Sequence, residues 1–294
     1  MSDVTRPVLR YHGGKWKLAP WIISHFPAHR IYVEAFGGAA SVLLRKPRSW
    51  AEIYNDLDGE IVNLFRVLRN PVQARELIRL CRLTPYARSE FEVSYITADD
   101  PIEQARRTLF RSAAGFSSVG ATRNRRVGFR ARVDSSRTIY AVDWANLPDA
   151  LDAVVDRLRG VVIENEDVFT ILERYDSPET LFYLDPPYPH STRMDKKVYR
   201  HEMTDDDHRE LAKVVRQLKG MVIISGYPCD LYDQELYPDW RRVKCRTYAD
   251  RRRERTEVLW LSPAVMAIQK SLFEESPTVG EKEGSDDQKA NRHR

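Results

Sequence analysis

An acid, two prolines and an aromatic ring stand together at Asp185-Pro186-Pro187-Tyr188, directly after the apolar run at residues 181–184. That run is typical of a buried strand. A carboxylate accepts hydrogen bonds from an exocyclic amino group, and Pro187 keeps Pro186 extended, so that a backbone carbonyl can face the same group. Tyr188 can stack on a planar base. Two acceptors on an aromatic amine draw its nitrogen toward a tetrahedral geometry and free the lone pair. The tetrapeptide therefore predicts methyl transfer to a base amino group, although an ordinary Pro-Pro turn is the alternative.

Acids and glycines stand at matching positions after three other apolar runs. Glu34 ends the first run, and Gly37-Gly38 follows, where a ligand can approach the backbone closely. Asp56 follows the second run, about 20 residues after that turn, which is the spacing of an acid that accepts from ribose hydroxyls. Asp167 follows the third run and is placed to accept from an adenine amino group. Each acid alone is more often a helix cap, but four in register, counting Asp185, favour a nucleoside site.

The cofactor class follows from which motifs the chain has and lacks. It carries no full G-x-G-x-x-G, which disfavours a nicotinamide cofactor, and no G-x-x-x-x-G-K-[ST] for a nucleoside triphosphate. S-adenosylmethionine suits both the acidic glycine-bearing pocket and the amino-group trap. The sequence therefore predicts methyl transfer that depends on S-adenosylmethionine.

Strands and helices must bring these residues to one edge, and their alternation predicts how. Strands are expected at residues 31–36, 51–54, 161–165, 181–184 and 221–225, with a closing hairpin at 242–248 and 256–261. A tight turn is expected at residues 37–41, leading into a helix through Leu44, and further helices are expected near 58–68, 71–83, 102–114 and 204–218. This pattern predicts an α/β fold with a Rossmann-like, doubly wound and mostly parallel sheet. Such sheets bind ligands at the carboxyl ends of their strands.

A helical, arginine-rich segment interrupts this alternation between the second and third predicted strands. We expect a mainly helical target-recognition domain at residues 70–154, and a catalytic domain formed by residues 1–69 and 155–270. Residues 271–294 mix Glu, Lys and Asp with Ser, Gly and Pro, which is typical of a disordered tail.

Basic residues are concentrated in two places, although the net charge is only +4. Nine arginines and one acid lie between Arg106 and Arg137, which indicates contacts to DNA phosphates and bases. Because Arg pairs with guanine and Asn with adenine, the residues expected to read bases are Arg123, Asn124, Arg125, Arg126, Arg130 and Arg132. Those expected to hold phosphates are Arg106, Arg107 and Arg111. A second cluster, Arg251, Arg252 and Arg253, is expected in the hairpin turn beside the active site, with a solvated turn as the alternative.

Composition limits the class of protein. The chain of 294 residues is 42% hydrophobic, enough for one large domain or about two ordinary ones. Cys81, Cys229 and Cys245 are odd in number and far apart, which indicates reduced thiols and not disulfides or a zinc site. The chain lacks an apolar run near the roughly 20 residues of a membrane span, and its N-terminus lacks a signal-peptide core. We expect a cytoplasmic monomer that binds double-stranded DNA, with no metal and no membrane.

The motifs and their order resemble those of the DNA adenine N6-methyltransferases of the Dam, or D12, class over most of residues 8–262. Residues 10–15 are similar to the family's aromatic-x-Gly-Gly-Lys motif, 33–41 to its cofactor turn and 55–58 to its ribose-binding turn. Residues 185–188 match its catalytic motif fully, and 204–212 and 257–260 resemble a later helix and strand. The chain departs from the family at Ala35, where Pro is usual, at Ala39, where Gly is frequent, and at Tyr11, where Trp is common.

The resemblance implies roles for individual residues. The implied catalytic residues are Asp185, Pro186, Pro187 and Tyr188. The implied cofactor-binding residues are Tyr11, Lys15, Glu34, Phe36, Gly37, Gly38, Asp56, Asp167 and Asp185. Tyr11 and Lys15 would contact the cofactor or the target adenine. The target base would be flipped out of the duplex, and catalysis would come mainly from positioning.

Other functions remain open at this point. Cytosine N4 presents an amine of similar geometry, although Asp at the first tetrapeptide position favours adenine. Pro228-Cys229 resembles the nucleophile of cytosine C5 methylation, but N6 chemistry needs no covalent enzyme intermediate, and a loop thiol is the plainer interpretation. RNA or protein substrates are chemically possible. A non-catalytic DNA-binding protein on the same fold is a further alternative, which the intact Asp185 and Lys15 disfavour.

Overall fold

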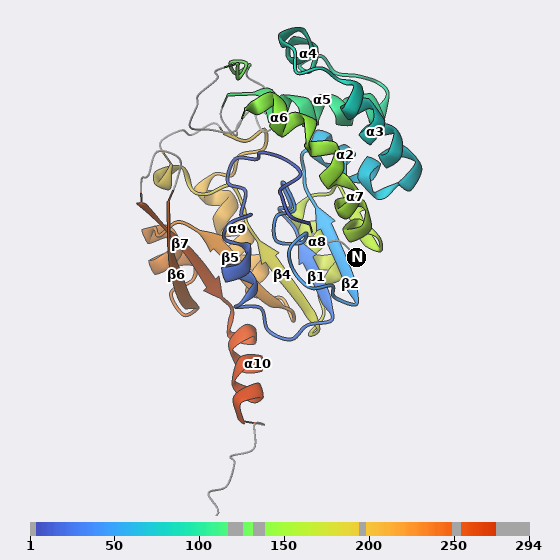
Figure 1. Ribbon diagram of the computed structural model, residues 1–294. Coiled ribbons are helices and arrows are strands. Elements are labelled where there is room, and N and C mark those ends of the chain that lie inside the picture. The colour runs from blue at the N-terminus through green and yellow to red at the C-terminus, as the bar shows by residue number, and fades with distance from the viewer. Residues whose placement is uncertain (1–3, 117–125, 132–138, 194–197, 249–253, 275–294) are drawn as a thin grey trace, which may run out of the picture.

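The computed structural model describes residues 4–116, 126–131, 139–193, 198–248 and 254–274, which form a layered α/β fold (Figure 1). The strands of this part of the chain make one seven-stranded sheet in the order β3-β2-β1-β4-β5-β7-β6. They are β1 (Ile31–Glu34), β2 (Ala51–Asn55), β3 (Val161–Glu164), β4 (Thr180–Leu184), β5 (Met221–Gly226), β6 (Arg241–Tyr248) and β7 (Glu254–Leu261). Every strand predicted from the sequence is present, so the predicted Rossmann-like fold class is confirmed.

The pairing directions bring the ends of the strands together at one edge. β1 pairs in parallel with β2 and β4, β2 with β3, and β4 with β5. β7 is antiparallel to both β5 and β6. Strands β1 to β5 therefore share one carboxyl edge, and β6, which runs in the same direction as β5, ends there too.

The helices begin where polar side chains satisfy the free backbone N–H groups of the first turn. Asp58, Asn70, Asp100 and Thr204 accept such bonds at the starts of α2, α3, α5 and α9. The helices are α1 (Ala19–Ile23), α2 (Gly59–Arg69), α3 (Pro71–Leu83), α4 (Arg88–Val93), α5 (Pro101–Ala114), α6 (Tyr140–Ala145), α7 (Leu147–Leu158), α8 (Val168–Tyr175), α9 (Asp205–Val215) and α10 (Pro263–Glu274). The described residues also form a 3-10 turn, η2 (His190–Thr192), and a π-helical turn, η3 (Leu231–Leu236).

Alternate residues of the central strands enter two separate cores, as the two-residue period of a strand requires. Tyr32, Tyr54 and Tyr183 pack in a core that includes residues of α2, α3, α5 and α7. Val33 and Phe182 pack in the other, with residues of α8 and α9. Both faces of the sheet are therefore covered, which explains why the central strands read as continuous apolar runs.

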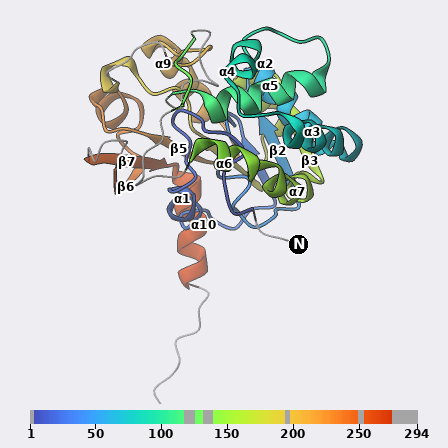
Figure 2. The same cartoon turned by 45° about the horizontal axis from the view of Figure 1, so that its top comes forward.

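The segment between β2 and β3 carries helices α2 to α7, of which α2, α3 and α5 were predicted from the sequence and α4, α6 and α7 were not. In Figure 1 the helices α4 to α6 lie at the top, beyond the arrowhead of β2, and Figure 2 shows them from a second direction. Their apolar side chains, such as Phe110 and Trp144, join the core that α2 shares with the sheet. The last helix of the segment, α7, crosses the domain boundary expected at residue 154 and ends at Leu158.

Two local predictions were wrong. Residues 37–41 form the predicted turn, but the helix expected to follow it through Leu44 is a series of turns, because Ala40 adopts a positive φ of 52° that a right-handed helix excludes. The tail was expected from Ser271, but α10 continues to Glu274 and projects from the body of the protein in Figure 1. The rest of the predicted tail, residues 275–294, lies outside the described residues.

Candidate active site

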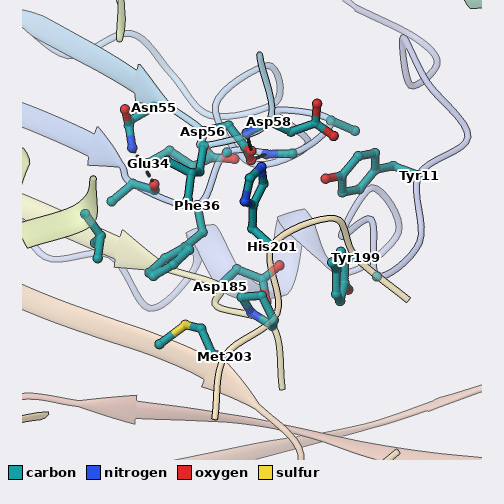
Figure 3. Close-up of a pocket in the computed structure, with 18 of the residues that line it drawn as sticks. Tyr11, Glu34, Phe36, Asn55, Asp56, Asp58, Asp185, Tyr199, His201 and Met203 are labelled. Atoms are coloured by element: carbon teal, nitrogen blue, oxygen red, sulfur yellow. Dashed lines mark hydrogen bonds between the residues drawn. The ribbon is translucent and has the colours of Figure 1, made fainter. Parts of the chain in front are cut away.

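A cavity of about 270 Å³ lies at the carboxyl edge of the sheet (Figure 3). Its wall comes from the ends of β1, β2 and β4, from the N-terminal segment 11–15 and from the loop 199–203. The nine predicted cofactor-binding residues all line it: Tyr11, Lys15, Glu34, Phe36, Gly37, Gly38, Asp56, Asp167 and Asp185. Of the predicted catalytic tetrapeptide, Asp185 and Pro187 line the cavity, whereas Pro186 and Tyr188 are buried beside it.

Asp185 follows β4 and is held from two sides. Its Oδ1 accepts a hydrogen bond from the Ser225 hydroxyl at 2.7 Å, and its Oδ2 pairs with the Lys15 ammonium at 2.8 Å. The Tyr183 hydroxyl donates to Ser225 Oγ at 3.1 Å and thereby orients the serine. The Asp185 side chain remains 18% exposed. These contacts fix the carboxylate at the cavity wall and leave lone pairs for a further donor.

Tyr188 lies below Lys15. The Lys15 ammonium sits 4.8 Å from the centre of the Tyr188 ring, and Tyr227 packs edge-on against the same ring at 4.7 Å. The Tyr188 hydroxyl donates to Glu257 on β7. Tyr188 is only 8% exposed, so its predicted role as a stacking surface requires a rearrangement of the side chains above it.

The turn after β1 admits only glycine at two positions. A Cβ atom at Gly37 would lie 2.1 Å from Cε2 of the buried Tyr54 ring, and that ring is held by a 2.8 Å bond from its hydroxyl to the Gly38 carbonyl. Gly38 has φ +47°, and a Cβ atom there would lie 2.7 Å from Cε1 of Tyr11. The turn therefore brings bare backbone to the cavity wall, as predicted for a cofactor turn.

Asp56 organises this turn. Its Oδ2 accepts the Gly38 N–H at 2.7 Å and its Oδ1 accepts the Asp58 N–H at 2.8 Å. Burial raises the pKa of Asp56 to about 6, although these two backbone bonds oppose the rise. Each carboxylate oxygen keeps a lone pair, so Asp56 can accept from a ligand hydroxyl without releasing the turn.

Asn55 joins the ends of neighbouring strands, and Asp167 caps the helix that follows β3. Asn55 Nδ2 donates to the carbonyls of Ala35 and Glu166, both at 3.0 Å, and Asn55 Oδ1 accepts the Glu166 N–H at 2.9 Å. Asp167 Oδ1 caps helix α8 by accepting the Phe169 N–H at 2.9 Å. The cap explains one oxygen of Asp167, and a role for the acid in binding an adenine amino group stays a prediction.

Glu34 is a buried acid at the base of the cavity. Its Oε2 accepts the Tyr32 hydroxyl at 2.8 Å and the Leu43 N–H at 2.7 Å. Burial raises the pKa of Glu34 to about 8, although the bonds from Tyr32 and Leu43 oppose the rise. Glu34 therefore supports the turn from the base of the cavity, and its burial favours the neutral form.

Sequence reasoning missed the loop that follows the tetrapeptide. Tyr199, Arg200, His201 and Met203 line the cavity, and Figure 3 shows Tyr199 beside Tyr11. The two rings are 6.5 Å apart. No motif marks these residues, and the nearest signal was their position between the tetrapeptide and the predicted helix. Ser225 and Glu257 were missed as site residues for the same reason.

The three arginines expected to hold phosphates instead form internal ion pairs. Arg106 pairs with Glu103 at 2.6 Å and Glu90 at 2.8 Å, and Arg107 pairs with Glu103 at 2.7 Å. Arg111 is nearly buried and pairs with Glu60. The phosphate assignment was wrong because these guanidinium groups hold the helical segment together.

The pair between Arg111 and Glu60 continues into the cavity wall. Arg200 donates to Glu60 at 2.8 Å and to Asp58 at 2.6 Å. Asp58 and Arg200 both line the cavity. One chain of charges therefore connects α5 in the helical segment with the loop that follows the tetrapeptide at residues 185–188.

Two of the residues predicted to read bases are described. Arg126 lies over the Tyr95 ring at 5.5 Å, and Arg130 lies over the Tyr140 ring at 3.5 Å. Arg123, Asn124, Arg125 and Arg132 lie outside the described residues, as do Arg251, Arg252 and Arg253. The neighbouring Arg255 bonds at 2.8 Å to the hydroxyl of Tyr227, the ring that packs on Tyr188. The start of β7 therefore lies close to the tetrapeptide.

The residues of the cavity suit S-adenosylmethionine. Phe36, Val168 and Phe169 offer apolar surface for an adenine ring, and Asp56 offers acceptors for ribose hydroxyls. Within the described ranges, no three His, Cys, Asp or Glu residues are grouped to hold a metal ion. Cys229 does not line the cavity, and burial raises the pKa of its thiol. Among the helices described here, none has the length and apolar character to cross a membrane.

Comparison with known proteins agrees with this geometry. Residues 11–242 match the sequence model of a family described as D12 class N6 adenine-specific DNA methyltransferase. The chain is also similar to the Type II methyltransferase M.MjaIII of Methanocaldococcus jannaschii. The two are 24% identical over 260 residues, which cover 77% of this chain and 86% of that protein.

Proposed function

The chain belongs to the D12 class of N6 adenine-specific DNA methyltransferases, and from this premise we propose how its residues carry out the reaction. Methyltransferases of this kind generally use S-adenosylmethionine, and we place that molecule in the cavity at the carboxyl edge. The substrate is an adenine flipped out of duplex DNA into the same cavity, beside Asp185. Flipping costs a few kcal/mol, which contacts to the extrahelical base and the DNA backbone must offset.

The cofactor would be held by groups that the fold already orients. The two oxygens of Asp56 are fixed by Gly38 and Asp58 at 2.7 and 2.8 Å, and would accept from the ribose hydroxyls. Phe36 and Phe169 would contact the adenine ring, and Asp167 its amino group. The bare backbone at Gly37-Gly38 would face the methionine part. S-adenosylmethionine, when bound, supplies an electrophilic methyl group.

The observation that carries the proposal is the Asp185 carboxylate, which is partly exposed at the cavity wall, is oriented by the Ser225 hydroxyl and pairs with the Lys15 ammonium. It would accept a hydrogen bond from adenine N6, and the Pro186 carbonyl would accept the second N–H. Together they align the nitrogen lone pair with the methyl group, and the acid stabilises the positive charge that develops on N6. Catalysis then comes from orientation and electrostatics, with no covalent bond to the enzyme.

DNA recognition would belong to the helical segment, for which we keep the range 70–154. Arg126 and Arg130 are held there by Tyr95 and Tyr140. The other residues proposed to read bases are Arg123, Asn124, Arg125 and Arg132, and those proposed to contact the backbone near the flipped base are Arg251, Arg252 and Arg253. Action as a monomer stays a prediction.

The test is the chemical identity of the product. Duplex DNA is incubated with the protein and S-adenosylmethionine, digested to nucleosides and separated by mass spectrometry. We expect N6-methyladenine in the digest, and long-read methylation mapping then gives the recognised sequence. N4-methylcytosine in place of N6-methyladenine would replace this proposal with the cytosine alternative.

A further inference from the structure

A cluster of buried charges lies behind the catalytic acid. Lys15 is 6% exposed, and its ammonium contacts three acceptors. It donates to the Gly13 carbonyl at 2.9 Å and to Asp185 Oδ2 at 2.8 Å, and it lies 3.6 Å from Glu257 Oε1. Glu257, on β7, is 2% exposed. The cluster therefore holds two carboxyl groups around one ammonium group.

The Lys15 ammonium lies where the proposed function places the amino group of the target adenine. The function proposed above places adenine N6 as a donor to Asp185 and the base over the Tyr188 ring. Lys15 already donates to Asp185, and its ammonium lies over the Tyr188 ring, 4.8 Å from its centre. Because a stacked base needs the face of that ring, Lys15 and the target base cannot occupy the site together.

Without a role in receiving the Lys15 ammonium, the burial of a carboxyl group at Glu257 is difficult to explain. A buried carboxyl group is costly unless it is paired, and the Tyr188 hydroxyl that donates to Glu257 would be satisfied by any neutral acceptor. Burial raises the pKa of Glu257, while Lys15 opposes that rise. The Lys15 ammonium is already within 3.6 Å of Glu257, so a short movement away from Asp185 brings the two groups into direct contact.

We propose that Lys15 occupies the place of the target amino group in the DNA-free protein, and that Glu257 is a positioning residue that receives the ammonium when the base enters. This inference rests on the proposed function, because that function assigns Asp185 to adenine N6. Lys15 stays protonated throughout. Burial alone lowers its pKa, but Asp185 and Glu257 raise it above the ordinary value. The exchange therefore requires movement of one side chain and no proton transfer.

The exchange predicts an unusual relation between two variants. In Glu257→Gln, base entry would leave the displaced ammonium buried without a counter-charge, so entry should become unfavourable. In Lys15→Met, no ammonium needs displacing, so entry should be at least as favourable as in the wild type. Adding Glu257→Gln to the Lys15→Met protein should then cause no further change in base entry, because the ammonium group that Glu257 would receive is absent.

The experiment measures base entry without methyl transfer. A duplex carrying the methylation site of this protein contains 2-aminopurine in place of the target adenine, and its fluorescence rises when the base leaves the stack. We expect Glu257→Gln to lower the equilibrium constant for base entry by about tenfold or more, because it leaves a buried charge unpaired. We expect Lys15→Met to match or exceed the wild type, and the double variant to match Lys15→Met.

Glu52→Gln is the matched control. Glu52 is another buried acid, 3% exposed, and it pairs with Lys46 at 2.6 Å away from the cavity. The Glu52→Gln variant should have a lower unfolding midpoint but unchanged base entry. Wild-type base entry in Glu257→Gln would overturn the inference, and so would a tenfold loss that persists in the Lys15→Met background, since Glu257 would then act through Tyr188. Absence of any rise with the wild type would instead contradict the proposed function itself.

Discussion

Replacing Asp56 by alanine should weaken cofactor binding and loosen the glycine turn together. Both carboxylate oxygens of Asp56 accept backbone N–H groups, from Gly38 at 2.7 Å and Asp58 at 2.8 Å. Hydrogen bonds to a charged group contribute about 1.5–3 kcal/mol. If the ribose hydroxyls use the remaining lone pairs, Asp56→Ala should raise the Kd for S-adenosylmethionine roughly 10- to 150-fold. The unfolding midpoint should fall as well, because two N–H groups lose their acceptors.

Isothermal titration with S-adenosylmethionine measures the first effect, and thermal unfolding measures the second. Asp100→Ala is the matched control, because Asp100 accepts two backbone N–H groups, of Ile102 and Glu103, at the exposed start of α5. It should lower stability without changing the Kd. An unchanged Kd in Asp56→Ala, or an equal change in Asp100→Ala, would refute the ribose assignment.

The pH dependence supplies a second check on Asp56. Burial raises its pKa to about 6, so the acid gains a proton as the pH falls through this value and loses acceptor strength. The Kd for S-adenosylmethionine should therefore be higher at pH 5 than at pH 7.5, two values that lie on either side of that pKa by about a unit or more. The free energy of unfolding should change with pH in the opposite direction to the strength of cofactor binding. A raised pKa in the folded state favours the protonated form, so this contribution to stability is full at low pH and is lost as the pH rises through about 6. Asp56→Asn should remove both dependences.

Three further outcomes are expected. Tyr188→Phe should keep more of the methylation rate than Tyr188→Ala because the ring remains, yet it should lower stability by about 1–3 kcal/mol in thermal unfolding, since Glu257 loses its hydroxyl donor. Glu60→Gln should weaken cofactor binding in a titration, because Arg200 at the cavity wall loses a charged partner at 2.8 Å; an unchanged Kd would show that Asp58 alone holds the loop. Replacing Arg251, Arg252 and Arg253 together by Ser should flatten the slope of log affinity against log salt by about one to three units in fluorescence anisotropy, with target preference unchanged. An unchanged slope would leave this cluster as a solvated turn.

The parts of the site that the sequence predicted depend on local signals. Asp185, Asp56 and Gly37 each follow a strand that its apolar run identifies, and parallel pairing brings the strand ends together without further information. Gly37 is informative because a Cβ atom there would collide with Tyr54 at 2.1 Å. A position at which only one residue type fits can therefore be interpreted from the sequence alone.

The parts that were missed depend on contacts between distant segments. Arg111 meets Glu60, and Arg200 meets both Glu60 and Asp58, across separations that no periodic pattern reports. The error at Arg106 and Arg107 was avoidable, because Glu103 stands three and four residues earlier on a predicted helix, where opposite charges pair. The helix expected after the turn at 37–41 is absent for a backbone reason, since Ala40 takes a positive φ that its residue type does not announce.

Asp185 is proposed to act on the amino group of adenine, and a comparison of methyl transfer with DNA binding tests that role. Tritium transfer from labelled S-adenosylmethionine to duplex DNA is measured for wild type and Asp185→Ala, with a gel shift to show that both bind the duplex. We expect N6-methyladenine from the wild type, and a loss of about 100-fold or more in Asp185→Ala, because a preorganised catalytic hydrogen bond is removed, while DNA binding survives. Retention of more than about a tenth of the wild-type rate, which is far above that expectation, would contradict the role of Asp185.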